Sequence, residues 1–413
     1  MKKFVIISVI LLLIGGGAFG YSLWHYIDTR TPAAAEATEA TQPAAEPSSE
    51  QPTSAESTAP TVSDTDLFAS GYEQAKAAVD NMSREELAGQ VLMGVCSDMD
   101  AGSADIAHYH LAGYLFESGA FGYKSSDEIK TGLQAIADTA PVAPILAVTE
   151  EGGDRNTVST AGGITDKSFD SPRNLLASGG LQEVEKTELD KAEFLHDLGI
   201  NLNLAPVVDM PNSYDQIMYT RSLSDDMNVV SDFAKYCAKH IQAKGVSVAL
   251  KHFPGYGTIP DSAASEAQAN GTAVIDTRDA DAIRTVDYEP FKAGVSEGAH
   301  FVLFSNVVVK NIDAAHTAAL SSALHKELRD LVGFTGIAIT DIIDDGDYST
   351  YAEGKNVAVA ALLSGNDIVI ARDYRTAYNA ILAAVNDGTL SEDILKQACT
   401  RVLAYKYAVG LAK

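Results

Sequence analysis

The sequence reads Lys251-His252-Phe253-Pro254-Gly255-Tyr256-Gly257-Thr258-Ile259-Pro260-Asp261-Ser262-Ala263 directly after an apolar run, Val246 to Leu250. The run is typical of a buried strand, and it ends in a Lys-His pair. A cation and an imidazole at the carboxyl end of a strand commonly serve a site. The Pro-Gly-x-Gly that follows allows unusual backbone angles in the next loop. The segment therefore predicts a strand that delivers two polar groups to a loop-lined site.

Similar apolar runs recur along the chain, and we expect eight strands: 90–96, 113–116, 144–149, 201–205, 246–250, 299–304, 336–340 and 367–371. Helical patterns lie between most of them or follow the last: 181–198, 225–244, 286–297, 319–331, 375–387 and 391–407. Continuous rather than alternating apolar runs indicate burial on both faces, as in parallel sheets. The pattern predicts an α/β fold, a single-domain (β/α)₈ TIM-type barrel. A doubly wound open sheet, which lacks ring closure, is the alternative.

The first 30 residues differ from the rest. Two lysines, Lys2 and Lys3, precede an uncharged apolar run from Phe4 to Trp24, and roughly 20 such residues span a bilayer. We expect a membrane-spanning signal-anchor over residues 1–30, with a single-pass chain whose globular part lies outside the cytoplasm. A cleaved signal peptide, which would make the protein secreted, is the alternative, because residues 15–20 are rich in small side chains.

Composition separates a linker from the globular part. Residues 31–66 are rich in Ala, Thr, Ser, Pro and Glu, which predicts a disordered linker, and residues 67–413 then form the barrel. The net charge of −26 excludes nucleic acid as an expected partner, because phosphate binding needs a basic surface. Three widely spaced cysteines have no metal-ligand spacing, so we expect buried thiols and no metal or cofactor.

Polar residues follow most of the predicted strands. In a barrel the carboxyl ends of all strands meet at one rim, so these side chains should converge there. They are Thr149 to Arg155, Asp209 with Arg221, Lys251 and His252 with Asp261, Ser305 and Asn306, and Thr340 with Asp341. Each also has a structural explanation: Asp341 could cap a helix, and Arg221 could pair with Asp225 or Asp226. The coincidence of all of them favours a site.

At these residues the chain resembles the N-terminal domain of glycoside hydrolase family 3, in its bacterial β-N-acetylhexosaminidase-like branch. The resemblance covers about 66–413. The residues that carry it are Glu150-Glu151-Gly152-Gly153, Asn203-Leu204-Ala205-Pro206-Val207-Val208-Asp209, Arg221-Ser222, Lys251-His252-Phe253-Pro254-Gly255-Tyr256-Gly257, Thr340-Asp341 and Gly365-Asn366-Asp367. The Lys-His-Phe-Pro-Gly-x-Gly run is a highly specific signal.

The resemblance implies an exo-acting glycosidase with a retaining mechanism. Its carbohydrate substrate would be a cell-wall-type glycan, including peptidoglycan fragments that contain N-acetylglucosamine. Asp341 matches the family's nucleophile, which forms a covalent glycosyl-enzyme. Arg221, Lys251 and His252 match residues that hold the sugar hydroxyls, and we expect Thr149 and Asp209 on the same substrate-binding wall.

The chain departs from the family at the proton donor. The usual His of an Asp-Ser-His triplet is Ala263 here, so Asp261 is the remnant of an acid/base dyad. Glu266, on the same predicted loop, is the local substitute that the sequence offers. Other departures are Thr149 and Asn306, where Asp and His are usual. Three hypotheses follow: an enzyme with a substitute proton donor, a membrane-tethered sugar-binding pseudoenzyme, and a protein that uses the barrel only as a scaffold.

Overall fold

The computed structural model describes residues 66–161 and 168–412. The predicted membrane segment, 1–30, and the predicted linker, apart from Asp66, lie outside these residues. Among the described residues, no helix is both long and apolar enough to cross a membrane.

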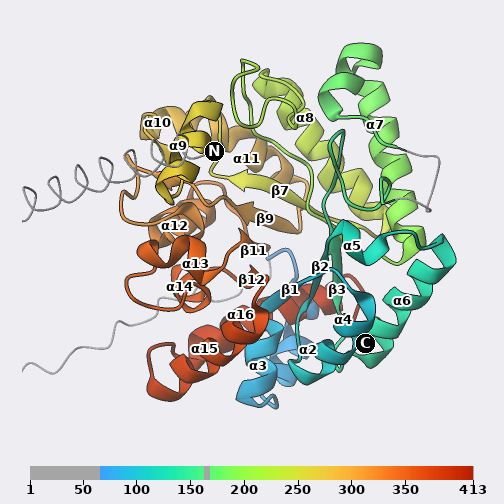
Figure 1. Cartoon of the computed structure of the whole chain (residues 1–413), viewed down its shortest axis with the longest axis vertical. Helices are drawn as coiled ribbons and strands as arrows, with labels where there is room; N and C mark the ends of the chain where they lie inside the picture. The colour runs from blue at the N-terminus through green and yellow to red at the C-terminus, as the bar shows by residue number, and fades with distance from the viewer. Residues whose placement is uncertain (1–65, 162–167, 413) are drawn as a thin grey trace, which may run out of the picture. The chain divides into compact units, whose positions relative to one another are not determined.

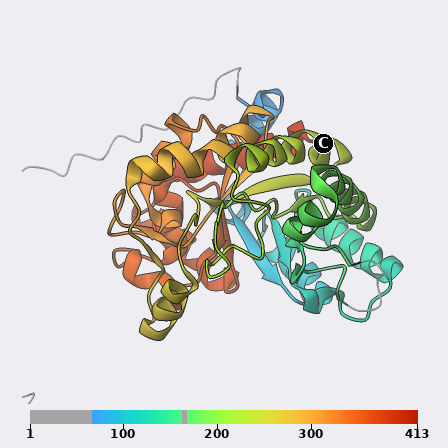
Figure 2. The same cartoon turned by 90° about the horizontal axis from the view of Figure 1, so that it is seen from above.

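Eight parallel strands close into a barrel, which confirms the predicted fold and rules out the open sheet. Helices surround the strands on the outside (Figures 1 and 2). Around the ring the order is β1, β12, β11, β9, β7, β6, β3 and β2. Their bounds are β1 Leu92–Cys96, β2 Gly113–Phe116, β3 Ile145–Val148, β6 Leu202–Asn203, β7 Ser247–Phe253, β9 Phe301–Phe304, β11 Ile337–Ile342 and β12 Ile368–Ala371. Every predicted strand has a counterpart in the ring.

Most predicted helices are present with shifted ends. The principal helices are α2 Ala69–Val79, α3 Arg84–Gln90, α4 Met99–His108, α6 Ser126–Thr139, α7 Pro172–Leu198, α8 Met227–Tyr236, α9 Asp261–Asn270, α11 Tyr288–Ser296, α12 Ser322–Asp330, α14 Val357–Ser364, α15 Tyr374–Asp387 and α16 Glu392–Ala408. Shorter ones are α5 Ser118–Phe121, α10 Ala280–Ala282 and α13 Asp345–Tyr348. A π-helical turn, Cys237–Ile241, and a 3₁₀ turn, Gln242–Lys244, continue α8. The predicted loop around Glu266 is wrong, because this residue lies within α9.

Two short sheets lie outside the ring. An antiparallel hairpin joins β4 Glu150–Gly152 to β5 Arg155–Asn156, and β8 Ile275–Asp276 pairs with β10 Val308–Val309. The hairpin turns sharply at Gly152 and Gly153, whose φ angles of 109° and 61° are left-handed. Since only glycine adopts such angles without strain, the Glu-Glu-Gly-Gly run fixes where the hairpin turns.

Two strands are irregular where they carry polar residues. The pairing of β7 with β9 shifts register between Lys251 and Phe253, and that of β11 with β12 shifts between Ile339 and Ile342. Such irregularities change the direction of a side chain relative to the regular ladder. They occur where Lys251, His252 and Asp341 leave the barrel wall. Strand β6 is shorter than predicted and ends at Asn203.

The amino-terminal end of the barrel is closed by α2 and α16, which lie together in Figure 1. The ring of Phe68 stacks edge-on against Tyr405 and His300, with centroids 5.4 and 5.6 Å apart. Tyr405 in turn contacts Phe301 of β9. These contacts tie the segment around Phe68 to the start of β9 and to α16.

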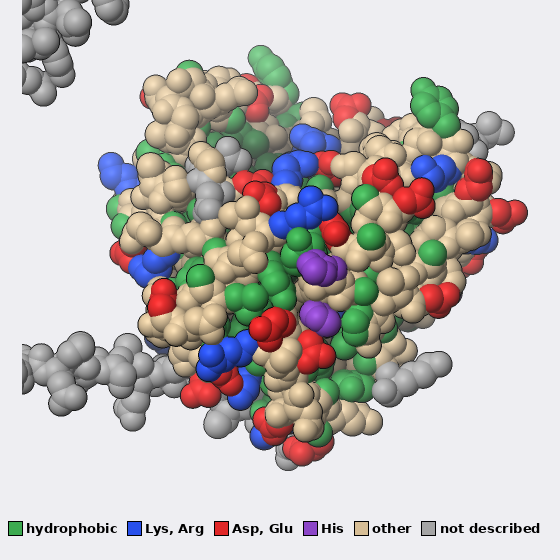
Figure 3. Space-filling model, turned by 60° about the horizontal axis from the view of Figure 1, so that its bottom comes forward, with side chains coloured by type: hydrophobic (Ala, Val, Ile, Leu, Met, Phe, Trp, Pro, Cys, Tyr) green, Lys and Arg blue, Asp and Glu red, His purple; other side chains and the backbone are tan. Residues whose placement is uncertain are grey.

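The surface carries both signs of charge. On the face drawn in Figure 3, Lys and Arg side chains lie among Asp and Glu side chains rather than forming one broad basic patch. The three cysteines are buried free thiols, as predicted. Burial raises the pKa of Cys96 to about 11 and that of Cys399 to about 12, so these thiols are protonated and unreactive at neutral pH.

Candidate active site

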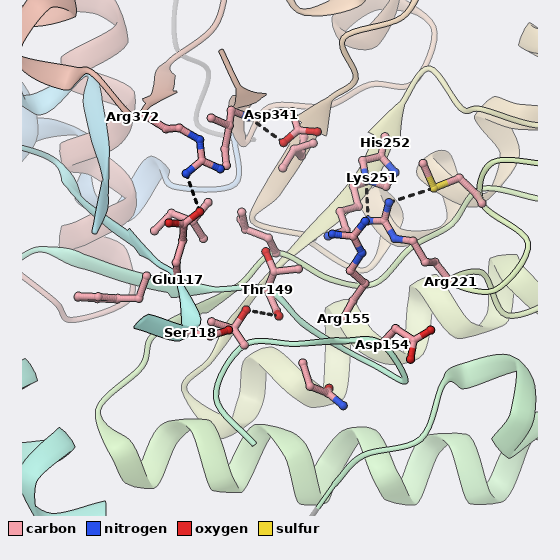
Figure 4. A pocket seen from close by; sticks show the side chains of 18 of the residues that line it. Glu117, Ser118, Thr149, Asp154, Arg155, Arg221, Lys251, His252, Asp341 and Arg372 are labelled. Atoms are coloured by element: carbon pink, nitrogen blue, oxygen red, sulfur yellow. Dashed lines mark hydrogen bonds and ion pairs between the residues drawn. The ribbon is translucent and has the colours of Figure 1, made fainter. Parts of the chain in front are cut away.

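A cavity of about 440 Å³ opens at the carboxyl ends of the strands (Figure 4). Its walls come from segments that are far apart in the sequence. They include Glu117 and Ser118 after β2, Thr149 after β3, Asp154 to Thr157 of the hairpin, Arg221, Lys251 and His252, Tyr256, Asp341 and Arg372. The sequence predicted convergence at one rim, and the ring closure brings Thr149, Arg221, Lys251, His252 and Asp341 to one cavity.

Glu151 anchors two of the cations beneath the cavity. Its carboxylate lies 2.5 Å from Lys251 Nζ and accepts hydrogen bonds from Arg221 Nε and Nη2 at 2.8 and 2.6 Å. Its own carbonyl accepts a hydrogen bond from the buried Lys191 of α7. Glu151 is only 3% exposed. This carboxylate therefore fixes both cationic side chains before any ligand arrives.

The charges of this cluster follow from burial and pairing. Burial alone would raise the pKa of Glu151, but Lys251 and Arg221 outweigh it and hold that pKa well below its usual range. Burial lowers the pKa of Lys251, and Glu151 opposes this shift. The cluster is thus built around one firmly ionised carboxylate that two cations share.

His252 is oriented by a second buried carboxylate. Its Nδ1 lies 2.7 Å from Asp209 Oδ2, and Arg221 Nη2 lies 3.2 Å from its Nε2. Burial lowers the pKa of His252 against the opposing effect of Asp209, which favours the neutral ring. Since Arg221 can only donate, the arrangement assigns the ring proton to Nδ1. The imidazole presents a fixed edge to the cavity.

Asp209 plays a different part from the one expected of a sugar ligand. It is 1% exposed and does not line the cavity. Besides His252 Nδ1, it accepts hydrogen bonds from the backbone N–H groups of His252 and Tyr256. Asp209 therefore holds the Lys-His strand end and the Gly255–Gly257 loop in register with each other.

Asp341 stands at the end of β11 and lines the cavity from the wall opposite Arg155 (Figure 4). One of its oxygens, Oδ1, accepts a hydrogen bond of 2.7 Å from the N–H of Ile342. The Asn306 amide donates to the Ile342 carbonyl at 3.1 Å, which ties the ends of β9 and β11 together. The carboxylate of Asp341 thus shares the cavity with Lys251 and Arg221.

The comparisons with known proteins identify the family. Residues 83–405 match the model of the glycosyl hydrolase family 3 N-terminal domain. The chain belongs to glycosyl hydrolase family 3. The segment from Lys251 to Gly257, which begins in β7, and Asp341 of β11 are both inside the matched range.

Individual relatives are more distant. An uncharacterized secreted glycosyl hydrolase of Arthroderma benhamiae is 29% identical over 237 residues, 55% of this chain and 66% of the relative. A β-hexosaminidase of Xylella fastidiosa strain M12 is 34% identical over 146 residues, 35% of this chain and 41% of the relative. The chain thus spans less than two thirds of either relative's length.

Solved structures of family 3 share the fold. A β-N-acetylglucosaminidase from Paenibacillus sp. FPU-7 superposes with a TM-score of 0.71 at 21% sequence identity. The alignment covers 80% of this chain and 63% of that protein. At this identity the likeness supports the barrel architecture only.

The segment that departs from the family pattern lies away from the cavity. Asp261 and Glu266 are exposed on α9, and neither lines the cavity. Ala263 is half-buried and packs against an apolar cluster of the barrel. The structure therefore does not bring Asp261 or Glu266 together with Asp341, Lys251 and His252.

Several residues at the cavity are not predicted by the sequence. The sequence places Glu151 in a motif of the family without indicating its role, although its position beside two glycines is a usable signal. The Glu117–Arg372 ion pair, at 2.6 Å, and Tyr256 also line the cavity. Nothing local marks Glu117 or Arg372, because they follow strands at opposite ends of the chain. Among the described residues, no group of three or more His, Cys, Asp or Glu side chains is arranged to hold a metal.

Proposed function

We propose that this chain is an exo-acting retaining β-N-acetylhexosaminidase of family 3 that acts on cell-wall-type glycans, including peptidoglycan fragments with N-acetylglucosamine. The observation that carries the proposal is the placement of Asp341 across the cavity from Lys251, Arg221 and His252. The β-hexosaminidase relative supports the sugar class.

In the first step, a carboxylate oxygen of Asp341 bonds to the anomeric carbon while the bond to the leaving oxygen breaks. Lys251 and Arg221 donate hydrogen bonds to sugar hydroxyls, and neutral His252 fixes a further one. Glu151 keeps both cations in place, so little reorganisation is needed as charge develops. In the second step, water attacks the anomeric carbon, its proton passes to a base, and Asp341 is released.

This mechanism also needs a general acid that protonates the leaving oxygen. Ala263 has no titratable group, and Glu266 would have to leave its present position on α9 to reach the leaving oxygen. Glu117 is a carboxylate that already lines the cavity, where it pairs with Arg372. Both glutamates are candidates for the general acid, and Glu117 needs no movement of a helix.

Hydrolysis of two substrates tests the activity. We expect turnover of an aryl β-N-acetylglucosaminide, whose leaving group needs little protonation, and slower turnover of a natural β-linked disaccharide. Asp341→Asn should reduce both rates by at least about 10³-fold, because it removes the nucleophile.

The outcomes separate the three hypotheses. Retained sugar binding without turnover of either substrate would favour the tethered pseudoenzyme. Absence of both binding and turnover would leave only the scaffold protein. Product of inverted configuration would contradict the retaining mechanism.

We propose further that residues 1–30 hold the barrel at the outer surface of the cell membrane. The apolar run from Phe4 to Trp24 supports this, and one relative is described as secreted. Cell fractionation checks it: the full chain should sediment with membranes, and a chain that begins at residue 65 should not. Recovery of the full chain in the medium with a shortened amino terminus would instead indicate cleavage.

A further inference from the structure

We propose that the cavity selects sugars that carry a carboxylate, and that Arg155 is the residue that recognises it. The inference deepens the proposed function and rests on it, since it takes the cavity to be the sugar site. It concerns specificity, whereas the proposed function concerns the reaction.

The cations of the cavity differ in whether they are paired. Arg221 and Lys251 share the buried Glu151, and Arg372 forms an ion pair with Glu117. Arg155 lines the same cavity. Within the described part of the chain, residues 66–161 and 168–412, no side chain forms an ion pair or hydrogen bond with its guanidinium. It is the cation of this wall that remains available to a ligand.

The side chain of Arg155 points into the cavity. Figure 4 shows it extending from the hairpin on the side of Lys251 and Arg221, while Asp154 points away from them. Of the other hairpin residues that line the cavity, Asn156 and Thr157 are neutral, and Asp154 is the one that carries a carboxylate.

The hairpin that carries Arg155 is firmly held. The Glu150 carboxylate accepts hydrogen bonds from the N–H groups of Val158 and Ser159, at 2.7 and 3.2 Å. The Asn156 amide donates to the carbonyls of Gly153 and Phe169, at 3.0 and 2.9 Å. The backbone under Arg155 is therefore positioned in advance, and a ligand needs to order only the side chain.

An unpaired guanidinium discriminates strongly between neutral and anionic ligands. It forms two parallel hydrogen bonds with the two oxygens of a carboxylate, whereas a hydroxyl offers a single oxygen and carries no charge. A carboxylate on a sugar has two common sources: C6 of a uronic acid, or the lactyl ether of N-acetylmuramic acid. Both present the same group, and binding measurements tell them apart.

Isothermal titration calorimetry on the whole chain provides the test, with two matched pairs of sugars. Glucuronic acid is compared with glucose, and N-acetylmuramic acid with N-acetylglucosamine. We expect at least one acidic sugar to bind about 10-fold more tightly than its neutral partner, because a charge-assisted hydrogen bond is stronger than a neutral one. The preference should shrink as salt is raised.

Two variants test whether Arg155 causes the preference for the acidic sugar. Arg155→Gln should abolish the preference for the acidic sugar and leave binding of the neutral partner within about 2-fold. Arg375→Gln removes an arginine of α15 that pairs with Asp105 outside the cavity, and it should keep the preference.

The outcomes distinguish this inference from the proposed function. Equal binding of acidic and neutral sugars, or a preference that persists in Arg155→Gln, overturns the inference and leaves the hydrolase proposal in place. An Arg155-dependent preference in a chain that hydrolyses nothing supports the inference while the reaction fails. Absence of binding for all four sugars overturns the inference, and it overturns the hydrolase proposal only if turnover is absent as well.

Discussion

At the scale of single residues, Ala263 occupies the position where the family has its proton donor, and Glu117 is the carboxylate that could replace that donor. Ala263 packs against an apolar cluster, and the helix that carries it contributes nothing to the cavity wall. Glu117 lies on that wall, where its carboxylate accepts a hydrogen bond from Ser97 Oγ at 3.2 Å. General acid catalysis requires the donor to be within hydrogen-bond reach of the leaving oxygen, directly or through one water. Geometry favours Glu117 over Glu266.

Replacement of Glu117 should therefore affect substrates according to their leaving group. We predict that Glu117→Gln lowers hydrolysis of a natural disaccharide by about 10²-fold or more, and that of an aryl glycoside much less. Steady-state kinetics on both substrates measure the ratio. Glu266→Gln should leave both rates unchanged.

Arg372→Gln is the matched control, because it breaks the same ion pair but keeps the carboxyl group. If it lowers the natural-substrate rate as much as Glu117→Gln does, then the pair acts only in binding. A selective loss in Glu266→Gln would instead show that α9 moves during catalysis. Ala263→His should leave the natural-substrate rate unchanged unless α9 moves, because position 263 packs against an apolar cluster away from the cavity.

The individual site residues were predictable only in part. Lys251, His252 and Asp341 stand at the ends of apolar runs, where a barrel places its chemistry, so the strand pattern alone indicated them. Glu151 could not be assigned a partner in this way. It lies 70 residues before Arg221, and only closure of the ring brings the two together. Arg372 and Glu117, 255 residues apart, illustrate the same limit.

At the scale of secondary structure, burial explains which elements the sequence indicates. All eight strands were predictable, because a strand that is covered on both faces is continuously apolar. Helix α14 was missed for a related reason: it is buried nearly all round, so no helical period separates an apolar face from a polar one. Helix α6 had a usable signal, the capping box of Ser125 and Glu128, which fixes its first turn.

The loop after β7 shows how elements outside the ring support the site. Arg278 donates to the Gly255 carbonyl at 2.8 Å and pairs with both Asp276 and Asp287. A side chain at position 257 would collide with this guanidinium, since a Cβ there would lie 1.8 Å from Arg278 Nη1. The second glycine of the Pro-Gly-x-Gly run is therefore required by close packing as well as by its φ of 47°.

At the scale of the whole molecule, two buried carboxylates act on stability with opposite pH dependence. The pKa of Glu151 is held below its usual range, so its stabilising contribution is present above about pH 4.5 and is lost as the pH falls. Burial raises the pKa of Asp287 to about 6. The positive charge of Arg278 opposes this shift, but Arg278 also pairs with Asp276, and the negative charges of Asp209 and Asp276 raise the pKa further. Asp287 therefore favours the folded state when it is protonated.

The sign for Asp287 gives a testable prediction. A folded-state pKa above the unfolded value of 3.8 means that its contribution is present at low pH and lost as the pH rises through about 6. Asp287→Asn stays neutral, so wild type should lose about 2 kcal/mol of unfolding free energy relative to this variant between about pH 4.5 and about pH 7.5. Denaturant unfolding at four pH values measures the difference, and Asp281→Asn, an exposed carboxylate paired with Arg284, is the control. Parallel stability curves for wild type and Asp287→Asn would show that Arg278 fully offsets the burial of Asp287, and that the support under the Gly255–Gly257 loop does not respond to pH.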